Sequence, residues 1–300
     1  MILGEYAVLA GGAAIVAAMA PRFGAVPLEG KPGWHASSPA GKLERWATAK
    51  GLDVPAFRLN DPWNGAGGFG GSTAEFVLLY HALAEQTKWS LSAVGAHRMY
   101  RELTAGDPVP PSGADLVAQW SGGVVRFDPV PGSIEPRGAV FDWRKLLVFS
   151  ATHQPGRKVA THEHLAVLAD HGFDGSAEPP LVAVLRAILA DFDQALSLSN
   201  TDDQVVGAAL TRYAQVLSKA GFESPEASED RRALCEIPGV LGAKGCGAML
   251  TDAVIVLATD APARADAVRL ATARGLRLVN GLNGLNGPRG LNGSEKGINA

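Results

Sequence analysis

The pattern of apolar and polar positions changes near residues 145–155 of the chain. Before that point, short apolar runs typical of strands mix with stretches in which apolar residues recur every three or four positions, as on one face of a helix. The predicted strands are 2–3, 6–9, 13–18 and 123–127. The predicted helices are 43–50, 73–88, 91–103 and 112–120.

Beyond that point, long amphipathic helices alternate with compact apolar strands. The predicted helices are 158–171, 181–196, 203–220 and 261–274. The predicted strands are 146–151, 253–258 and 276–279. This mixed order predicts an α+β protein in two layered parts. We expect domains at 1–150 and 151–280, followed by an Asn/Gly-rich tail at 281–300 that repeats Leu-Asn-Gly and has no apolar period to fold against.

The composition of the chain is that of a globular protein. The chain has 300 residues, of which 47% are hydrophobic and 19% charged, which is ordinary for a globular protein. A net charge of -3 gives no reason to expect nucleic acid or an anionic membrane as partner. The apolar run 7–20 is too short to span a bilayer and has no basic segment before it. Cys235 and Cys246 are the only cysteines, so we expect a cytoplasmic protein without disulfides.

A glycine-rich segment at 65–71 precedes a helical run. Five of its seven residues are glycine, and Ser72-Thr73 follow directly. Free backbone N–H groups and the macrodipole at a helix start favour a phosphate group there. Ser72 could also ligate a phosphate-bound Mg²⁺, although no Gly-Lys-Ser/Thr ends the segment, so it is not a Walker A motif. A flexible turn capped by Ser72 is the alternative.

Three more glycine-punctuated segments carry polar residues that could act in chemistry: Gly4-Glu5-Tyr6-Ala7-Val8-Leu9, Pro111-Ser112-Gly113-Ala114-Asp115 and Gly242-Ala243-Lys244-Gly245-Cys246-Gly247-Ala248. Glu5 alone reads as an outward-facing edge-strand acid. Asp115 is either part of a capping arrangement with Ser112 or a carboxylate that accepts a proton from a substrate hydroxyl. The third segment is either a loop whose backbone binds an anion or a connecting loop without such a role.

Together, and in this order, the four segments resemble the motifs of the GHMP kinase superfamily, which includes galactokinase, homoserine, mevalonate and phosphomevalonate kinases. Gly4 to Leu9 is similar to the first motif of the mevalonate-pathway branch, and Gly68 to Ala74 to the phosphate loop. Pro111 to Asp115 resembles the Pro-Ser-Gly-Ile-Asp segment of mevalonate kinases, and Lys244 to Asp252 the third motif. The resemblance extends to about residue 280.

The resemblance implies an N-terminal domain like ribosomal protein S5 domain 2, a ferredoxin-like C-terminal domain, and MgATP on the phosphate loop. It implies that Asp115 is the catalytic base and Ser72 the Mg²⁺ ligand. The residues that it implies for ATP are Gly67, Gly68, Gly70, Gly71, Ser72 and Thr73. Those that it implies for the acceptor substrate are Glu5, Lys244, Gly245, Cys246, Gly247 and Ala248.

The acceptor implied is mevalonate or 5-phosphomevalonate, in an enzyme of isoprenoid biosynthesis. The Gly-Glu-Tyr sequence and Asp252 are more similar to the motifs of phosphomevalonate kinases. The Pro-Ser-Gly-Ala-Asp sequence is more similar to that of mevalonate kinases. Arg157 and Lys158 are candidates for an acidic group of the substrate, or simply solvated charges. Assembly into homodimers stays open.

The chain also departs from the family pattern. Family members have a strand ending in Pro-Gly-Lys before Gly-Glu-Tyr; Met1 falls inside that strand, so the lysine is not in this sequence. Gly71 replaces a usual serine, and Met249-Leu250 replace usual glycines. The alternatives are therefore a degenerate GHMP-fold protein that binds ligand without phosphoryl transfer, and a GHMP kinase for another small metabolite.

Two other arrangements are weak. His153, His162, His164 and Glu163 could be taken for a metal site, but positions i and i+2 of a helix face apart. Cys246 has no identifiable histidine partner, which argues against a cysteine nucleophile.

Overall fold

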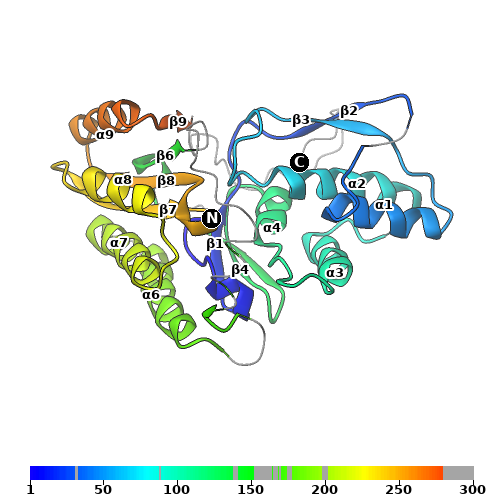
Figure 1. Cartoon of the computed structure of the whole chain (residues 1–300), viewed down its shortest axis with the longest axis horizontal. Coiled ribbons are helices and arrows are strands. Elements are labelled where there is room, and N and C mark those ends of the chain that lie inside the picture. The colour runs from blue at the N-terminus through cyan, green and yellow to red at the C-terminus, as the bar shows by residue number, and fades with distance from the viewer. Residues whose placement is uncertain are drawn as a thin grey trace.

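A computed structural model describes residues 1–30, 33–87, 89–137, 141–151, 164, 168, 170–173, 178–197 and 202–279. Two groups of elements lie side by side, with the start of the chain between them (Figure 1). The first group comprises η1 (Ala7–Ala10), β1 (Ala14–Ala17), β2 (Gly24–Pro27), α1 (Pro39–Ala49), β3 (Phe57–Asn60), α2 (Gly71–Thr87), α3 (Ala93–Thr104), α4 (Ala114–Ser121), β4 (Val124–Asp128) and β5 (Ser133–Pro136). The second comprises η2 (Trp143–Lys145), β6 (Leu146–Ser150), α6 (Pro180–Ser197), α7 (Asp203–Lys219), α8 (Pro225–Cys235), β7 (Val240–Cys246), η3 (Ala248–Leu250), β8 (Ala253–Ala258), α9 (Ala261–Ala273) and β9 (Arg277–Val279).

The first group contains two small sheets. β1, β4 and β5 form an antiparallel sheet in the order β1-β4-β5, with Ile15 opposite Arg126. β2 and β3 form a separate antiparallel ribbon, visible at the upper right of Figure 1. α4 packs on β1 and against α2 and α3. The N-terminal ends of α2 and α4 therefore lie near one another, beside the sheet.

The second group is built on one antiparallel sheet in the order β7-β8-β6-β9. Numbered along the chain, the strands run 4-1-3-2 across the sheet when read from β9, which is the order of a ferredoxin-like sheet. α8 and α9 connect and cover its strands, while α7 packs on β7. This topology agrees with the predicted ferredoxin-like part.

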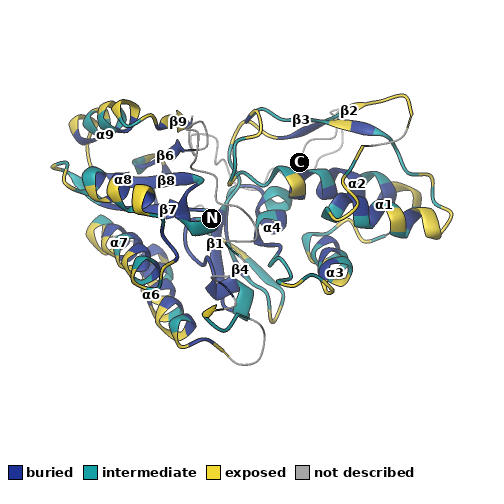
Figure 2. Cartoon of the chain, in the orientation of Figure 1, coloured by how far each residue is buried: buried dark blue, intermediate teal, exposed yellow. Residues whose placement is uncertain are grey.

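Both faces of this sheet are buried, which explains the unbroken apolar sequence of its strands (Figure 2). Successive side chains of a strand point to opposite faces, so Leu147 and Phe149 pack with Leu234 of α8, in a small core that also includes residues of α9. Leu146 and Val148 face the other way and join the main core, which is shared with the first group of elements. The two groups are thus held together by apolar contact.

α7 and β7 approach one another through facing glycines. A Cβ added to Gly242 would lie 2.0 Å from the carbonyl oxygen of Gly207, and a Cβ added to Gly207 would lie 2.5 Å from that of Leu241. No side chain fits between the helix and the strand at this point. Gly242 therefore has a packing role, and not the place in an anion-binding loop that the sequence indicated.

Several predicted elements are confirmed and others are wrong. The helices predicted at 73–88, 91–103, 181–196 and 203–220 are present within a few residues, as are the strands at 13–18, 146–151 and 253–258. The strand predicted at 6–9 is wrong, because Ala7–Ala10 form a 3₁₀ turn. The loop predicted at 242–248 is wrong as well, because it is mostly strand β7. β2, β3, β5 and α8 were not predicted, and most of the helix predicted at 158–171 lies outside the described residues.

The fold class, a mixed α+β protein, is confirmed, whereas the domain limits 1–150 and 151–280 stay a prediction. β6 begins at Leu146 and belongs to the second sheet. None of the described helices combines the length and the apolar character that crossing a bilayer requires.

Candidate active site

The glycine segment is a turn that leads directly into α2. Gly68 and Gly70 have φ angles of +80° and +79°, in the left-handed region where side chains are strained. A Cβ on Gly68 would lie 2.8 Å from Cβ of Asp252, and one on Gly70 would lie 2.6 Å from Nε2 of Gln119. A side chain at either position would therefore be strained; at Gly68 it would also collide with Asp252, and at Gly70 it would displace the Gln119 amide.

The first turn of α2 follows at once, with the Ala74 N–H donating to the carbonyl of Gly70. Ser72 is exposed and Thr73 is buried. The preceding N–H groups of such a turn have no intrahelical acceptor. A glycine cradle that opens into a helix N-terminus beside an exposed hydroxyl fits a nucleotide phosphate with its Mg²⁺. Gly67, Gly68, Gly70, Gly71 and Ser72 would hold it.

Asp115 lies in the first turn of α4 and faces this loop. Thr73 Oγ1 donates a hydrogen bond of 2.5 Å to Asp115 Oδ2, and the Leu116 N–H donates to Asp115 Oδ1 over 3.0 Å. Gly113, with φ of +74°, turns the chain into α4. The carboxylate is only partly buried and therefore remains accessible from the pocket described below.

Gln119 joins α4 to the glycine loop itself. It is one helical turn beyond Asp115, on the same face of α4. Its Nε2 donates to the carbonyl of Gly70 over 2.9 Å, and more weakly to that of Phe69 over 3.4 Å. The loop is fixed relative to Asp115 by two separate contacts from α4.

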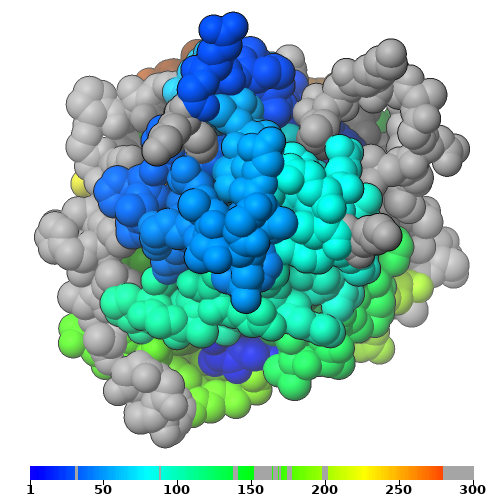
Figure 3. Space-filling model, turned by 90° about the vertical axis from the view of Figure 1, so that its right-hand side faces the viewer, coloured from blue at the N-terminus to red at the C-terminus, as the bar shows by residue number. Residues whose placement is uncertain are grey.

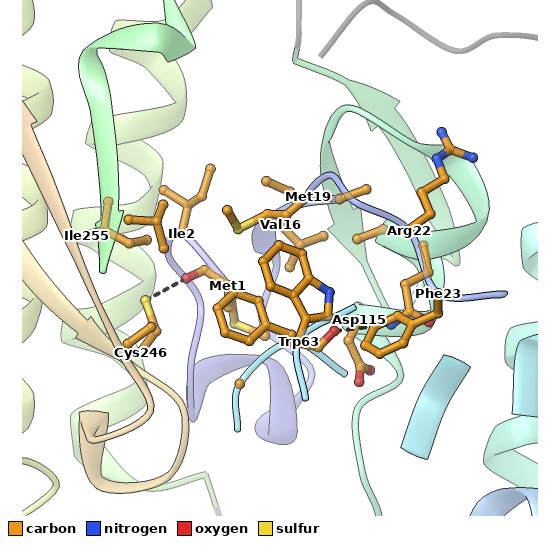
Figure 4. A pocket seen from close by; sticks show the side chains of 18 residues that line it. Met1, Ile2, Val16, Met19, Arg22, Phe23, Trp63, Asp115, Cys246 and Ile255 are labelled. Carbon is orange, nitrogen blue, oxygen red and sulfur yellow. Dashed lines mark hydrogen bonds between the residues drawn. The ribbon is translucent and has the colours of Figure 1, made fainter. Parts of the chain in front are cut away.

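A pocket of about 110 Å³ lies beside Asp115, between the two groups of elements. Its walls are mainly apolar side chains, with Ile2 and Ile255 side by side at the left and Val16 and Met19 nearer Arg22 (Figure 4). Trp63, which is 5% exposed, stacks on Phe69 of the glycine loop with ring centroids 4.4 Å apart. Arg22 stands at the rim, with its guanidinium turned away from Asp115 in Figure 4. Among the lining residues it is the one basic side chain.

Glu5 and Lys244, which the resemblance implies for the acceptor substrate, meet inside the protein, and Glu5 is buried, so the expectation of an outward-facing edge-strand acid is wrong. Lys244 has no exposed surface, and its Nζ donates to Glu5 Oε1 over 2.6 Å and to the Gly245 carbonyl over 2.7 Å. Tyr213 donates its hydroxyl to the Glu5 carbonyl over 2.8 Å. The pair joins the first motif to β7, which supports a positioning role in place of the predicted contact with substrate.

The turn after Glu5 is strained. Tyr6 has φ 65° and ψ -47°, and the Ala7 N–H donates to the Glu5 carbonyl over 2.7 Å, which makes this a γ-turn. The Tyr6 hydroxyl accepts a hydrogen bond from the Met249 N–H over 3.2 Å, and burial raises the pKa of that hydroxyl well above its usual range. First and third motifs are therefore in direct contact.

In the third motif, the predicted substrate residues have different surroundings. Cys246 lines the pocket, and its Sγ donates to the Met1 carbonyl over 3.2 Å. Gly245 is packed against Leu250, and Gly247 against Asp252. Ala248 begins η3. Only Cys246 of this group borders the pocket, among the residues that the structure describes.

Met249 and Leu250, which replace glycines of the family, both have positive φ angles, of 50° and 56°. The chain thus keeps a backbone shape that favours glycine, and the side chains there are strained. At Gly71, by contrast, an added Cβ would make only ordinary contacts, at 3.8 Å from Phe23. The structure would accommodate the serine that is usual in the family at this position.

Of the six other candidate residues, the structure describes only His164. His164 is half-buried beside Tyr6, with ring centroids 5.7 Å apart, and burial lowers the pKa of His164. His153, His162, Glu163, Arg157 and Lys158 lie outside the described residues. Within the described part of the chain, no cluster of three or more histidine, cysteine or acidic residues could hold a metal ion.

With this geometry established, the chain can be compared with known proteins. No family model and no curated protein matches it. Among solved structures, phosphomevalonate kinase of Streptococcus pneumoniae in complex with phosphomevalonate and AMPPNP has a TM-score of 0.67 at 16% identity, over 92% of this chain and 95% of that one. Galactokinase of Lactococcus lactis complexed with galactose has a TM-score of 0.66 at 15% identity, over 91% and 86%.

A third structure, mevalonate kinase of L. major in complex with R-mevalonate, has a TM-score of 0.62 at 19% identity, over 91% of this chain and 88% of that one. This chain has the GHMP kinase fold. The predicted resemblance is thereby confirmed at the level of fold. Within the GHMP kinase fold, identities this low leave activity and substrate to be argued from the site.

Sequence reasoning missed three residues of the site. Gln119 could have been found, because it follows Asp115 by four positions on one helical face. Arg22 and Trp63 stand in irregular segments without a recognisable pattern, and only the fold brings them to the pocket.

Proposed function

We propose that this protein is an ATP-dependent small-molecule kinase that phosphorylates mevalonate or 5-phosphomevalonate. The observation that carries the proposal is the contact between Thr73 and Asp115, which puts a carboxylate beside a phosphate-type loop and at the wall of a mainly apolar pocket. Phosphoryl transfer needs these three things: a phosphate cradle, a base and a sheltered place for the acceptor.

In this proposal, Asp115 accepts the proton of the attacking hydroxyl. Its Oδ2 is already fixed by Thr73 and its Oδ1 by the Leu116 N–H, so the carboxylate keeps its orientation. MgATP supplies the phosphoryl group and the cation that screens its charge. The helix start at Gly71 to Thr73, with the exposed Ser72 hydroxyl, would hold both.

The pocket supports a small acceptor with an apolar body and an acidic group. Val16, Met19 and Ile255 offer apolar contact, and Arg22 is the cation at the rim that can turn toward a carboxylate or phosphate. Both mevalonate and 5-phosphomevalonate have a methyl-branched body and an acidic end. An uncharged sugar would leave Arg22 without a partner.

The test is ADP release with MgATP and, in turn, mevalonate, 5-phosphomevalonate, galactose and homoserine. We expect turnover with one of the first two, and a loss of at least about 100-fold in Asp115→Asn, since removing a general base typically costs that much. Asp53→Asn is the matched control, because Asp53 is an exposed carboxylate away from the pocket.

Turnover with galactose or homoserine would place the protein among kinases for another metabolite. Binding of MgATP without turnover on any acceptor would identify a degenerate ligand-binding relative, and would contradict the proposal. Cytoplasmic location and the absence of nucleic-acid and membrane partners remain part of the same proposal.

A further inference from the structure

A second pocket, of about 460 Å³, lies behind the segment that leads to Asp115. One wall is a face of α3, and the others are η1, Ser112 and the turn between β4 and β5. In Figure 3 a deep-blue patch from the start of the chain shows directly below the blue-green segment that includes α3, with yellow-green atoms beneath it. The two pockets share no lining residue.

The polar groups of this second pocket are mostly basic and come from α3. His97, Arg98 and Arg101 recur at helical spacing and line it, with Glu102 as the one acid. Arg98 is exposed, and no hydrogen bond or ion pair of its guanidinium occurs in the described part of the chain. A free guanidinium beside a second one, in a concave site, is suited to a phosphate group.

The remaining walls are apolar. Val8, Leu9, Val94 and Val130 line the pocket, and Val130 is 79% exposed. Exposed valine side chains beside two guanidinium groups favour a ligand that has both a charged and an apolar part. The chemistry therefore matches an organic phosphate with a short hydrocarbon body better than a bare inorganic ion.

Two of the basic residues also hold the segment before Asp115. His97 Nε2 donates to the Ser112 carbonyl over 2.8 Å, and Arg101 Nη1 donates to the carbonyls of Pro110 and Pro111 over 3.2 and 2.5 Å. A Cβ on Gly113 would lie 2.6 Å from the His97 ring. His97 and Arg101 therefore both line the second pocket and hold the turn that leads into α4.

We infer that this pocket is a regulatory site for a small organic phosphate, and that its occupation lowers the activity governed by Asp115. A phosphate draws Arg101 more strongly than neutral carbonyls do, because its hydrogen bonds are charge-assisted. Binding therefore loosens the support of Pro110 and Pro111, and with it the position of the Asp115 carboxylate.

The first experiment measures binding of n-butyl phosphate by calorimetry. Inorganic phosphate, which has only the charged part, and butanol, which has only the apolar part, are measured for comparison. We expect butyl phosphate to bind more tightly than either. Arg98→Gln should weaken it at least about 10-fold, as expected for one charge-assisted hydrogen bond. Val130→Asp should abolish binding by charge repulsion, and folding should tolerate it because the side chain is exposed. Arg269→Gln on α9, where the side chain is 79% exposed, and Val130→Ala are the matched controls.

The phosphate loop is a competing place for the same probe, and Gly70→Ala distinguishes the two. Binding that survives Arg98→Gln and Val130→Asp but disappears in Gly70→Ala would overturn the inference. Binding unchanged in all three variants would overturn it too. This measurement does not depend on turnover, so its outcome is independent of the proposed kinase activity.

The second experiment follows ADP release at saturating substrates. Butyl phosphate should lower kcat and leave the KM for ATP unchanged, and in Arg98→Gln the same inhibition should need at least about 10-fold more butyl phosphate. Inhibition that is competitive with ATP, or whose concentration dependence is unchanged in Arg98→Gln, would contradict the regulatory role.

Discussion

Thr73 Oγ1 donates its hydrogen bond to Asp115 Oδ2 across 2.5 Å, although the two residues are 42 positions apart in the chain. Thr73 is 2% exposed, so this hydroxyl does not depend on solvent for a partner. The contact is the direct connection between the helix that follows the glycine loop and the helix that presents the carboxylate.

Replacing Thr73 by valine should lower kcat by about 10- to 100-fold, the value of one hydrogen bond to a charged group. The side chain keeps its shape, so the KM for ATP should change little. Thr73→Ser retains the hydroxyl and should recover most of the rate. Steady-state kinetics of the two variants checks this, and an equal loss in both would contradict the prediction, because retaining the hydroxyl in Thr73→Ser would then not restore the rate.

Two glycines of the same segment offer a matched comparison. Gly65 and Gly70 have φ angles of +76° and +79°, but a Cβ on Gly65 meets nothing within 4 Å, whereas one on Gly70 meets Gln119. Gly65→Ala should cost about 1 kcal/mol of stability from backbone strain alone and keep activity. Gly70→Ala should in addition reduce activity at least 10-fold, because the added Cβ would displace the Gln119 amide that donates to the Gly70 carbonyl.

Urea denaturation and ADP release, measured on both variants, separate backbone strain from the displacement of Gln119. If Gly65→Ala lost as much activity as Gly70→Ala, the close packing against Gln119 would not be the cause of the lost activity in Gly70→Ala.

The buried pair of Glu5 and Lys244 should be costly to break on one side. Lys244→Met leaves the Glu5 carboxylate buried and unpaired, which typically costs about 3 to 5 kcal/mol. Adding Glu5→Gln removes that charge, so the double variant should be more stable than Lys244→Met alone. Urea denaturation of the two single variants and the double variant measures the coupling. Additive losses would mean that the two groups do not interact in solution.

His81 should make the protein less stable in mild acid. Burial lowers the pKa of His81, against a smaller opposing effect of Glu85. As pH falls through about 6.5, the unfolded chain takes up the proton before the folded protein does, so the free energy of unfolding decreases. His81→Phe keeps the stacking on Trp120, where ring centroids are 4.2 Å apart, and removes the titration.

The decrease in Tm between pH 7.5 and 5.5 should therefore be smaller in His81→Phe than in the parent protein. His97 and His164, whose pKa values burial also lowers, account for part of the remaining decrease. The same replacement at the exposed His35 serves as control. A decrease of equal size in His81→Phe and the parent protein would contradict the prediction.

Much of the fold was predictable because its strands and helices have regular apolar patterns. β8 is a continuous run of buried residues from Ala253 to Ala258, and α6 and α7 have clear helical spacing. α8 was missed although Ser224 and Pro225 form a recognisable helix start, because its many charged residues conceal an apolar face.

Other elements could not be predicted from local pattern. The run from Tyr6 to Leu9 reads as a strand because its residues are apolar, but the left-handed backbone of Tyr6 turns the chain instead. β2 and β3 are four-residue strands with half of their residues exposed, and such short strands have no distinctive period.

At the site, the resemblance of motifs identified Asp115 and the glycine loop, but not how they contact one another. Lys244 and Glu5 are 239 positions apart, and nothing in either segment shows that they pair inside the protein. A buried ion pair of this kind forms because the two groups of elements pack against one another. The local sequence around either residue carries no information about that packing.

The stacking of Trp63 on Phe69 gives the protein a built-in optical reporter. The chain has six tryptophans, and in the described lining of the pocket beside Asp115 Trp63 is the one that occurs. Its indole is shielded from water and touches the loop that would receive a phosphate. The part of the tryptophan emission that Trp63 contributes, which the difference between the parent protein and Trp63→Phe isolates, therefore reports the state of the loop and of the pocket together, without any label attached to the protein.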